Sequence, residues 1–403
     1  MVRSEDYTPS IATRDSEVSV SFAEVQYQDT AVRVLRAAVA GDRLAHAYLF
    51  VGPRGVGKGL VARELAKLLF CESPRGKTAD ALDPCDQCTH CRRVDRGTHP
   101  DLYWFRKEED HNDFRICLVV RGNESPPGAT VIESVVLHPM EARHTVTVLD
   151  DAELLNKNAA NALLKTLEEP SPHAVLILLC ADASQLPGTI LSRCQGVRFG
   201  PLPEEFVAGK VREALTARAA KTPPQGKKAE PPAAVSAEEI AFVCRFAGGS
   251  IEQAARLAGS GLWALKRQVL TQLPEMDAAA ALDMAAAIDK WARDQAKQAR
   301  AKVESPEGHA LRRRASRLAL AAAASAFGDA GVLAGTGNAG RPINADQPTT
   351  IAALAGWPAE AIAQAVGILA DAQAHIGRYV HTELATENAL VQLSRLRPPA
   401  ARK

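Results

Sequence analysis

The chain has 403 residues, of which 46% are hydrophobic and 24% are charged, so it is long enough for two or three soluble domains with cores of their own. Its formal net charge of +1 excludes a global basic field for nucleic acid, so any DNA contact has to be local or shared with partners. The N-terminal residues lack the apolar core of a signal peptide, and the longest aliphatic run, residues 175–181, is too short to span a bilayer. We therefore expect a cytoplasmic protein with no membrane partner.

The first motif in the chain is a phosphate-binding loop. Residues 46–51 have the pattern of a short buried strand, and residues 60–69 have the apolar spacing of a helix. Glycines between a strand and a helix let consecutive backbone N–H groups surround phosphate oxygens, and a lysine there neutralises the terminal phosphates. The candidate nucleotide-binding residues of this loop are Gly52, Gly55, Gly57, Lys58 and Gly59. The alternative, a glycine-rich turn that merely begins a helix, does not account for the strand, the spacing and the lysine together.

The last position of the loop departs from the usual pattern. A serine or threonine hydroxyl normally follows the lysine and binds magnesium, whereas Gly59 has no side chain to do so. The loop is therefore expected either to hold ATP without hydrolysing it or to remain only as a scaffold, and true hydrolysis with Mg²⁺ stays open as the alternative.

A cluster of cysteines follows the loop helix. Cys71 precedes Cys85, Cys88 and Cys91, which are spaced as C-x2-C-x2-C. Cytoplasmic thiols stay reduced, so tetrahedral zinc coordination fits this spacing better than disulfides do. Four thiolates leave no open position for water, which predicts a structural zinc, and a variant with His90 or His99 in place of Cys71 remains open. The scattered cysteines are expected to be core or incidental residues: Cys117, Cys180, Cys194 and Cys244.

Short apolar runs alternating with helices predict an α/β domain with a parallel sheet. The expected strands are residues 48–51, 102–105, 145–149 and 175–179. The third of them ends in Asp150, which has the position and form of the second acidic motif of P-loop ATPases and would hold the water shell of magnesium beside the loop. Active motors follow it with a glutamate, but Asp151 is one methylene shorter, which displaces the carboxylate by about 1 Å or more. For Asp151 and Glu153, simple helix capping is the alternative.

An arginine follows the last predicted strand. Arg193 lies in the sequence Leu-Ser-Arg-Cys at a predicted helix end, presented away from its own P-loop. It could enter the nucleotide site of a neighbouring subunit as an arginine finger, which is worth roughly 10³ to 10⁵ in rate. The alternative is an ordinary surface or helix-capping arginine.

Composition changes mark the remaining organisation of the chain. The proline-rich, charged residues 222–232 predict a flexible linker or surface insertion, and the glycine-rich residues 335–342 predict a long loop. From residue 237 onward the chain is alanine-rich and favours helices. Apolar residues at helical spacing in this part are Leu262 and Leu265, then Ile362, Val366 and Leu369. No role is assigned to residues 106–127.

Taken in order, these motifs resemble those of the bacterial clamp-loader subunits of DNA polymerase III. The motifs that carry the resemblance are residues 46–50 (HAYLF), 52–58 (GPRGVGK), Cys71-Glu72 with the three-cysteine run, 163–170 (LLKTLEEP) and 191–194 (LSRC). The resemblance covers about residues 20–260. It implies an AAA+ domain over 20–202 with a zinc module at about 71–91, a small helical lid over 203–261, and an all-α collar over 262–403 through which five subunits assemble. It also implies the task of opening the ring-shaped sliding clamp and placing it on primed DNA.

Within that family, the departures from pattern distinguish two types of subunit. A gamma/tau motor carries a hydroxyl, a glutamate, a threonine and a lid arginine where this chain has Gly59, Asp151, Cys180-Ala181 and the segment 249–252. Tyr27 also departs from the glycine that usually precedes the glutamine near the adenine pocket. Because the arginine motif is intact, the chain resembles a delta-prime subunit, with gamma/tau and delta as partners. Two alternatives remain: an ATP-hydrolysing gamma/tau-type motor, and a stand-alone P-loop protein, which would be a monomer.

Overall fold

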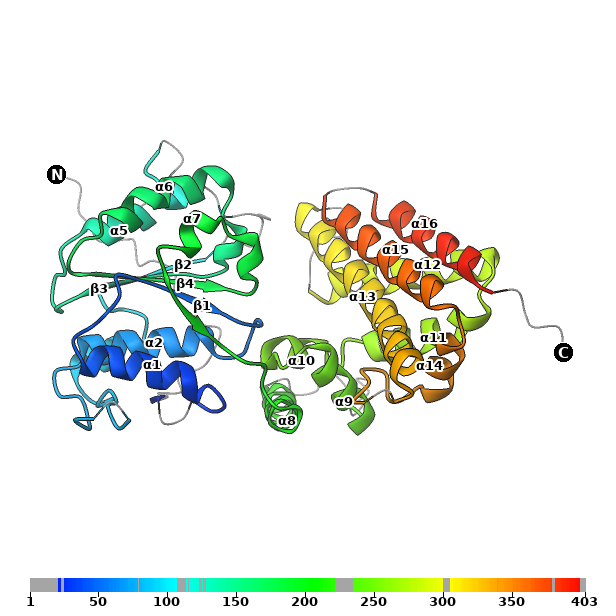
Figure 1. The fold of residues 1–403 in the computed structure, drawn as a ribbon, viewed down its shortest axis with the longest axis horizontal. Coiled ribbons are helices and arrows are strands. Elements are labelled where there is room, and N and C mark those ends of the chain that lie inside the picture. Colours follow the sequence, from blue (N-terminus) through cyan, green and yellow to red (C-terminus); the bar gives the residue numbers. More distant parts are fainter. Residues whose placement is uncertain are drawn as a thin grey trace. The chain divides into compact units, whose positions relative to one another are not determined.

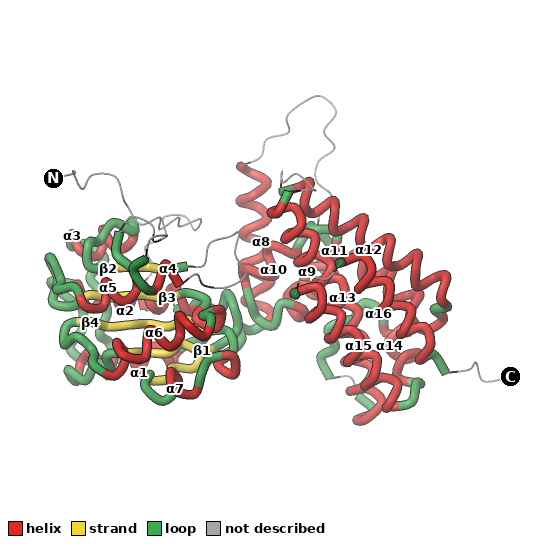
Figure 2. Tube along the Cα trace, turned by 90° about the horizontal axis from the view of Figure 1, so that it is seen from above, coloured by secondary structure: helices red, strands yellow, loops and turns green. Residues whose placement is uncertain are grey.

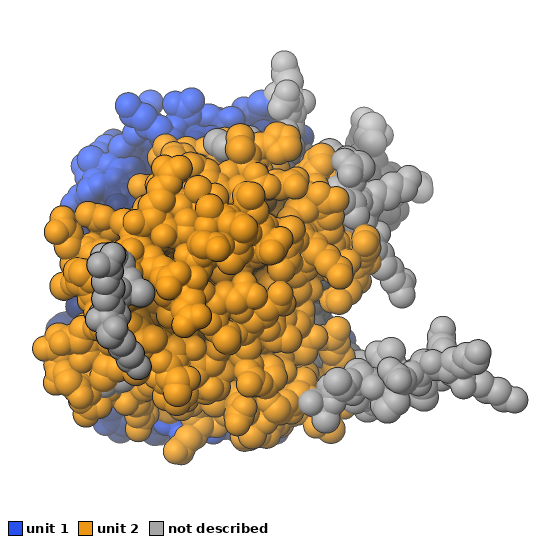
Figure 3. Space-filling view, turned by 90° about the vertical axis from the view of Figure 1, so that its right-hand side faces the viewer, with its two compact units in different colours: residues 1–202 blue, residues 203–403 orange. Residues whose placement is uncertain are grey.

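The computed structural model describes residues 21–398, except 23–24, 79, 107–113, 115, 123–124, 126–127, 222–234, 300–304, 339 and 379–380. The chain divides into two compact units, Met1–Leu202 and Pro203–Lys403, which are coloured separately in Figure 3. The proline-rich segment 222–232, predicted as a linker or insertion, lies outside the described residues, as does most of the segment from 107 to 127.

The first unit is built on a parallel sheet with the strand order β2-β3-β4-β1-β5 (Figure 1). Its strands are β1 (Ala47–Val51), β2 (Leu102–Phe105), β3 (Thr145–Leu149), β4 (Ala174–Cys180) and β5 (Gln195–Arg198). The predicted α/β class and the four predicted strands are confirmed. The sequence did not reveal β5, because this edge strand has no apolar run and only Val197 is buried in it.

Helices cover both faces of the sheet, which is why side chains on both faces of its central strands are buried, including Thr145 and Thr147 of β3. In Figure 1, α1 (Asp29–Ala40) and α2 (Lys58–Phe70) lie on one face. On the other face lie α5 (Val131–Val136), α6 (Lys157–Glu168) and α7 (Gly188–Leu191). Alternate strand residues such as Leu49 and Leu176 pack in one buried cluster with Leu163 and Leu167 of α6. Two short helices, α3 (Thr89–Asp95) and α4 (Ile116–Val119), lie in the connections around β2.

Because all five strands are parallel, their carboxyl ends lie at one edge of the sheet. The P-loop follows β1 and the acidic motif follows β3, and β4 separates these two strands. The loops after β1, β3 and β4 therefore meet at this edge, where ligands of open α/β sheets bind.

The second unit is helical throughout its described regular structure (Figure 2). Its first helices are α8 (Glu204–Lys221), α9 (Ala237–Phe246) and α10 (Ile251–Leu257). They are followed by α11 (Leu262–Gln272), α12 (Ala278–Gln298), α13 (Pro306–Thr336), α14 (Pro348–Ala355), α15 (Ala359–Gly377) and α16 (Thr382–Leu396). The helical spacing read from the sequence is confirmed in α11 and α15, although Val366 is 38% exposed whereas Leu262, Leu265, Ile362 and Leu369 are buried.

One helix in the described residues, Gly308–Thr336, is long and apolar enough to cross a membrane, and the bent pair α14 and α15 passes the same test together. Core helices of soluble proteins also pass it. The apolar side chains of α13, among them Leu320 and Phe327, are buried in the core of the helical unit against α11, α12 and α14 to α16. The composition of α13 is thus accounted for by its central place in that core.

The predicted loop at residues 335–342 begins two residues later than expected, because α13 continues to Thr336. Gly337 ends the helix in the left-handed conformation with φ of 71°, which glycine adopts without strain. The loop after it is fixed by the carboxylate of Asp329, which accepts hydrogen bonds from the backbone N–H groups of Ile343 (3.1 Å) and Asn344 (2.8 Å).

Candidate functional site

The phosphate-binding loop lies between β1 and α2, as the sequence predicted. Gly55 and Gly57 have φ of 70° and 102°, a region that glycine enters without strain. Gly52 is required for a different reason, since a Cβ atom there would lie 2.3 Å from the carbonyl oxygen of Phe199. The backbone after Gly57 enters α2 directly at Lys58, so free N–H groups of the first turn face the loop.

Lys58 folds back into its own loop. Its Nζ donates to the carbonyl oxygens of Gly52 (2.5 Å) and Pro53 (2.8 Å), and the residue is only 8% exposed. Burial lowers the pKa of this lysine. The ammonium therefore has backbone partners that phosphate oxygens of a ligand could replace.

Gln28 links the P-loop to the end of β5. Its Nε2 donates to the carbonyl oxygens of Val56 (3.3 Å) and Gly200 (2.9 Å), and its Oε1 accepts from the N–H of Gly200 (3.1 Å). Tyr27, which the sequence marked as a departure, has φ of 64° and is 51% exposed. The glutamine thus has a structural role that its sequence position alone did not reveal.

Asp150 lies at the end of β3, where it was predicted, but it has a partner that the sequence did not suggest. Its Oδ2 accepts a hydrogen bond from Nε of Arg106 at 3.0 Å. Arg106 directly follows β2, the neighbour of β3, so both residues leave the sheet at the same edge. That common edge was the signal in the sequence that could have predicted the pair.

The other two carboxylates of the acidic motif are paired with the P-loop itself. Nη2 of Arg54 lies 2.8 Å from Oδ1 of Asp151 and 3.1 Å from Oε1 of Glu153. Oε2 of Glu153 accepts from the N–H of Ala181 (3.2 Å) at the end of β4. The Asp151 carboxylate accepts no capping hydrogen bond from the short turn that it begins, so the capping role considered for it is wrong.

Gly59 faces the ring of Trp104. A Cβ atom at position 59 would lie 3.5 Å from Cζ2 of that ring, and the guanidinium of Arg106 stacks above the same indole at 5.6 Å from a ring centroid. The side of α2 where a magnesium-binding hydroxyl usually stands therefore faces an aromatic surface. An open pocket of about 650 Å³ lies nearby. It is lined at the carboxyl ends of β1 and β4 and along β5 by Val51, Gly52, Ala181, Asp182, Ala183, Ser184, Gly196, Arg198 and Phe199.

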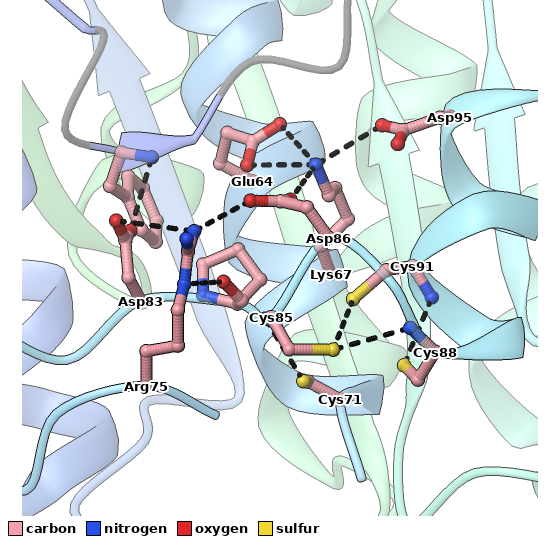
Figure 4. A network of polar contacts seen from close by, with 12 residues as sticks. Glu64, Lys67, Cys71, Arg75, Asp83, Cys85, Asp86, Cys88, Cys91 and Asp95 are labelled. Atoms are coloured by element: carbon pink, nitrogen blue, oxygen red, sulfur yellow. Dashed lines mark hydrogen bonds and ion pairs between the residues drawn. The ribbon is translucent and has the colours of Figure 1, made fainter. Parts of the chain in front are cut away.

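The four predicted metal ligands come together. The Sγ atoms of Cys71, Cys85, Cys88 and Cys91 all lie within 4.8 Å of one another (Figure 4). The Cys85 and Cys91 sulfurs are 3.9 Å apart, close to the roughly 3.8 Å expected between thiolates around a tetrahedral zinc ion. Although burial opposes it, hydrogen bonds from the N–H groups of Gln87 and Cys88 lower the pKa of Cys85 to about 7. These residues fit a metal ion that binds thiolates.

The two histidines considered as substitutes for Cys71 bond to each other instead. Nδ1 of His99 accepts from the N–H of Asp101 (3.1 Å), so its Nε2 carries the proton and donates to Nδ1 of His90 at 2.8 Å. His99 is buried against Phe70 at 4.2 Å between ring centroids, and burial lowers its pKa to about 4. The geometry thus favours Cys71 as the fourth ligand.

A fully buried lysine fastens the cysteine loop to α2 (Figure 4). Nζ of Lys67 lies 2.5 Å from Asp86, 3.2 Å from Asp95 and 3.3 Å from Glu64. Burial raises the pKa of Glu64 to about 8. Asp86 stands between two of the metal-ligand cysteines, so the ammonium joins the metal loop, α3 and the P-loop helix.

Arg193 lies at the opposite edge of the sheet from its own P-loop. It precedes β5, whose Gln195 pairs with Tyr48 near the start of β1, and Gly52 lies about 13 Å further along the strand at roughly 3.3 Å per residue. Its Nη2 contacts Oε1 of Glu168 at 2.6 Å, and its Nη1 donates to the Thr189 carbonyl at 3.0 Å. The side chain is 34% exposed, so it lies at the surface and is not buried against the sheet.

The remaining cysteines are placed as expected. Cys117, Cys180 and Cys244 are buried, and Cys194 is half-buried beside the apolar cluster of the sheet. Burial, followed by the neighbouring Glu153 carboxylate, raises the pKa of Cys180 to about 12. Cys180 is therefore a neutral thiol at the end of β4.

Residues 27–203 match the family described as "DNA polymerase III, delta subunit". DNA polymerase III subunit delta' of Pseudomonas aeruginosa is 35% identical over 226 residues, 56% of this chain and 60% of the relative. Subunit delta' of Bacillus subtilis is 30% identical over 197 residues, 49% of this chain and 55% of the relative. Subunit tau of Escherichia coli is 32% identical over 257 residues, 62% of this chain and 34% of the relative.

The matched segment thus spans about a third of the tau relative and less than two thirds of the delta' relatives. The match covers the P-loop, the four cysteines, the acidic motif and Arg193. Over residues 27–203 the α/β unit of this chain is therefore similar to DNA polymerase III subunits of the delta-prime and tau types.

Proposed function

We propose that the chain acts as a delta-prime-like subunit of the DNA polymerase III clamp loader and supplies Arg193 to the ATP site of a neighbouring subunit. The observation that carries this proposal is the position of Arg193, exposed at one edge of the sheet while the P-loop occupies the other. A guanidinium so placed is out of reach of its own nucleotide site but accessible to another chain.

The chemistry of the proposed finger is electrostatic. A guanidinium introduced in trans neutralises charge that develops on the transferring phosphoryl group, an effect of about 10³ to 10⁵ in rate. In this chain Arg193 pairs with the half-exposed Glu168. A surface ion pair of that kind is worth only about 0 to 1 kcal/mol, so phosphate oxygens can replace it at small cost.

The chain's own ATPase activity is expected to be weak or absent. Asp151, which stands where a motor has its water-activating glutamate, is paired with Arg54 at 2.8 Å. Gly59 supplies no hydroxyl, and buried Cys180 stands where a polar threonine is found in motors. Gly52, Gly55, Gly57, Lys58 and Gly59 remain arranged to hold phosphates, so we propose that the loop still binds a nucleotide.

Zinc is proposed as the ion held by Cys71, Cys85, Cys88 and Cys91, since four thiolates suit its tetrahedral preference. When bound, zinc supplies a cross-link between the end of α2 and the loop that precedes α3. Its role is structural, because no coordination position remains for a substrate.

The helical unit is proposed to provide the lid and the collar. Helices α8 to α10 would form the lid, and α11 to α16 the collar through which gamma/tau and delta assemble with this chain. Through that complex the chain would help load the sliding clamp onto primed DNA. The similarity of residues 27–203 to clamp-loader subunits argues against a stand-alone P-loop protein.

A gamma/tau-type motor is the second candidate, favoured by 32% identity to tau over 257 residues and by the retained Lys58 and Asp150. Steady-state ATP hydrolysis by the isolated chain distinguishes the two. We expect turnover no higher than that of the Lys58→Ala variant. Motor-like turnover that Lys58→Ala abolishes would contradict the delta-prime proposal and support the motor.

A further inference from the structure

All three carboxylates of the acidic motif are paired with guanidinium groups of the same chain. Arg106 holds Asp150 at 3.0 Å, and Arg54 bridges Asp151 at 2.8 Å and Glu153 at 3.1 Å. The two arginines reach the motif from different sides, one from the end of β2 and one from within the P-loop. Negative charge that a divalent cation usually offsets is therefore offset by the protein.

The residues at the P-loop and the acidic motif do not fit magnesium. Mg²⁺ requires octahedral oxygen ligands at about 2.0 to 2.1 Å, usually one or two protein oxygens together with phosphates and water. Here the hydroxyl position is Gly59, which faces the ring of Trp104. The remaining protein ligand, Asp150, has one carboxylate oxygen bonded to Arg106 and the other to the N–H of Asp151 (3.1 Å).

The arginine network is anchored in the core of the unit, which distinguishes it from ordinary surface ion pairs. The side chain of Glu153 is only 4% exposed, and its second oxygen accepts from the N–H of Ala181. Arg54 is thereby held to a buried carboxylate, while 49% of its own side chain stays exposed at the loop. Arg106 is 56% exposed and stacks on Trp104, so it too is accessible to a ligand at the P-loop edge of the sheet.

We propose that Arg106 and Arg54 take the place of the divalent cation, so that this P-loop binds a nucleoside diphosphate or triphosphate without metal. The inference rests on the nucleotide binding proposed above for the loop. Guanidinium groups stay charged at all physiological pH values and have planar donors that match phosphate oxygens. A guanidinium has five N–H donors, so one that holds a carboxylate retains others for a ligand.

Calorimetric titration of the full-length chain with ADP tests this directly, once in excess magnesium chloride and once in magnesium-free buffer without a chelator, so that the cysteine site keeps its metal. We expect dissociation constants that agree within about twofold. An affinity that falls about tenfold or more without magnesium contradicts the proposal. Absence of binding in both media also contradicts it, and it does so without affecting the proposed role of Arg193, which does not require nucleotide on this chain.

The variant Arg106→Gln distinguishes compensation of the phosphate charge by the guanidinium group from compensation by magnesium. In magnesium-free buffer its affinity for ADP should fall by about tenfold, and magnesium should restore part of it, because Asp150 is then free to accept a metal-bound water. Arg143→Gln, an exposed arginine of the same unit, is the matched control and should behave as the parent chain in both media. An Arg106→Gln variant that binds as tightly as the parent without magnesium would overturn the assignment.

Discussion

Lys67 is a buried charge on which the packing of the first unit depends. Its ammonium group has no exposure to solvent and meets the side chains of Glu64, Asp86 and Asp95. Removing one member of such a buried cluster leaves the others without compensation, which costs about 3 to 5 kcal/mol.

We therefore predict that Lys67→Met lowers the free energy of opening of α2 by about 3 to 5 kcal/mol, measured by native-state hydrogen exchange of the helix amides. Lys165→Met, at an exposed position of α6 in the same unit, should change it by less than about 0.5 kcal/mol. If both variants fell within about 1 kcal/mol of the parent, the buried ammonium would not be a structural link.

Some residues of the candidate site could be predicted from the sequence, and others could not. The P-loop glycines, Lys58 and Asp150 follow a fixed local spacing, and the cysteine spacing predicted the cluster that the structure forms. Arg54 and Arg106 were not recognised because their partners lie 99 and 44 positions away along the chain. Such pairs depend on strand order, which places the ends of β1, β2 and β3 at one edge.

Helices and strands were predicted correctly where their burial requires a regular pattern of apolar residues in the sequence. The four predicted strands consist largely of apolar and β-branched residues because helices cover the faces of the sheet, and the spacing of apolar residues from Leu60 to Leu69 predicted α2. The edge strand β5 carries Gln195 and Arg198 at exposed positions, so only its pairing with β1 identifies it. The apolar composition of α13 is explained by its packing in the core of the helical unit, which composition alone does not reveal.

The cysteine loop, from Cys71 to α3, is expected to depend on its metal. Ion pairs of Asp83 with Arg36 and of Asp86 with Lys67 hold this segment to the rest of the unit. Its described residues include few buried apolar side chains, among them Leu82 and Val94. Metal binding to four thiolates contributes roughly 10 kcal/mol or more to folding.

We predict that Cys88→Ser, or removal of metal with a chelator, increases hydrogen exchange of residues 71–95 while the amides of β1 and β4 stay protected. Cys194→Ser serves as the matched control, since Cys194 lies outside the cluster. Metal analysis of the purified chain should give one zinc ion for the parent and the control. An unchanged exchange pattern in Cys88→Ser, or a parent chain without zinc under reducing conditions, would contradict the structural metal site.

For the whole molecule, the two proposed functions lie at opposite edges of one sheet. The P-loop edge has its acidic motif neutralised by Arg54 and Arg106, and the other edge presents Arg193. The family match covers residues 27–203, and the helices beyond it are proposed to form the lid and the collar.

The most direct test is ATP turnover by a clamp loader reconstituted from gamma/tau, delta and this chain, with Arg193→Ala in place of the parent. Size-exclusion chromatography would establish that the variant assembles, and Arg143→Ala would serve as the matched control. We predict that Arg193→Ala lowers turnover by about tenfold or more, as expected for the loss of a finger that acts in trans, while the control retains the parent rate. A fully assembled loader with Arg193→Ala that turns over ATP at the parent rate would contradict it.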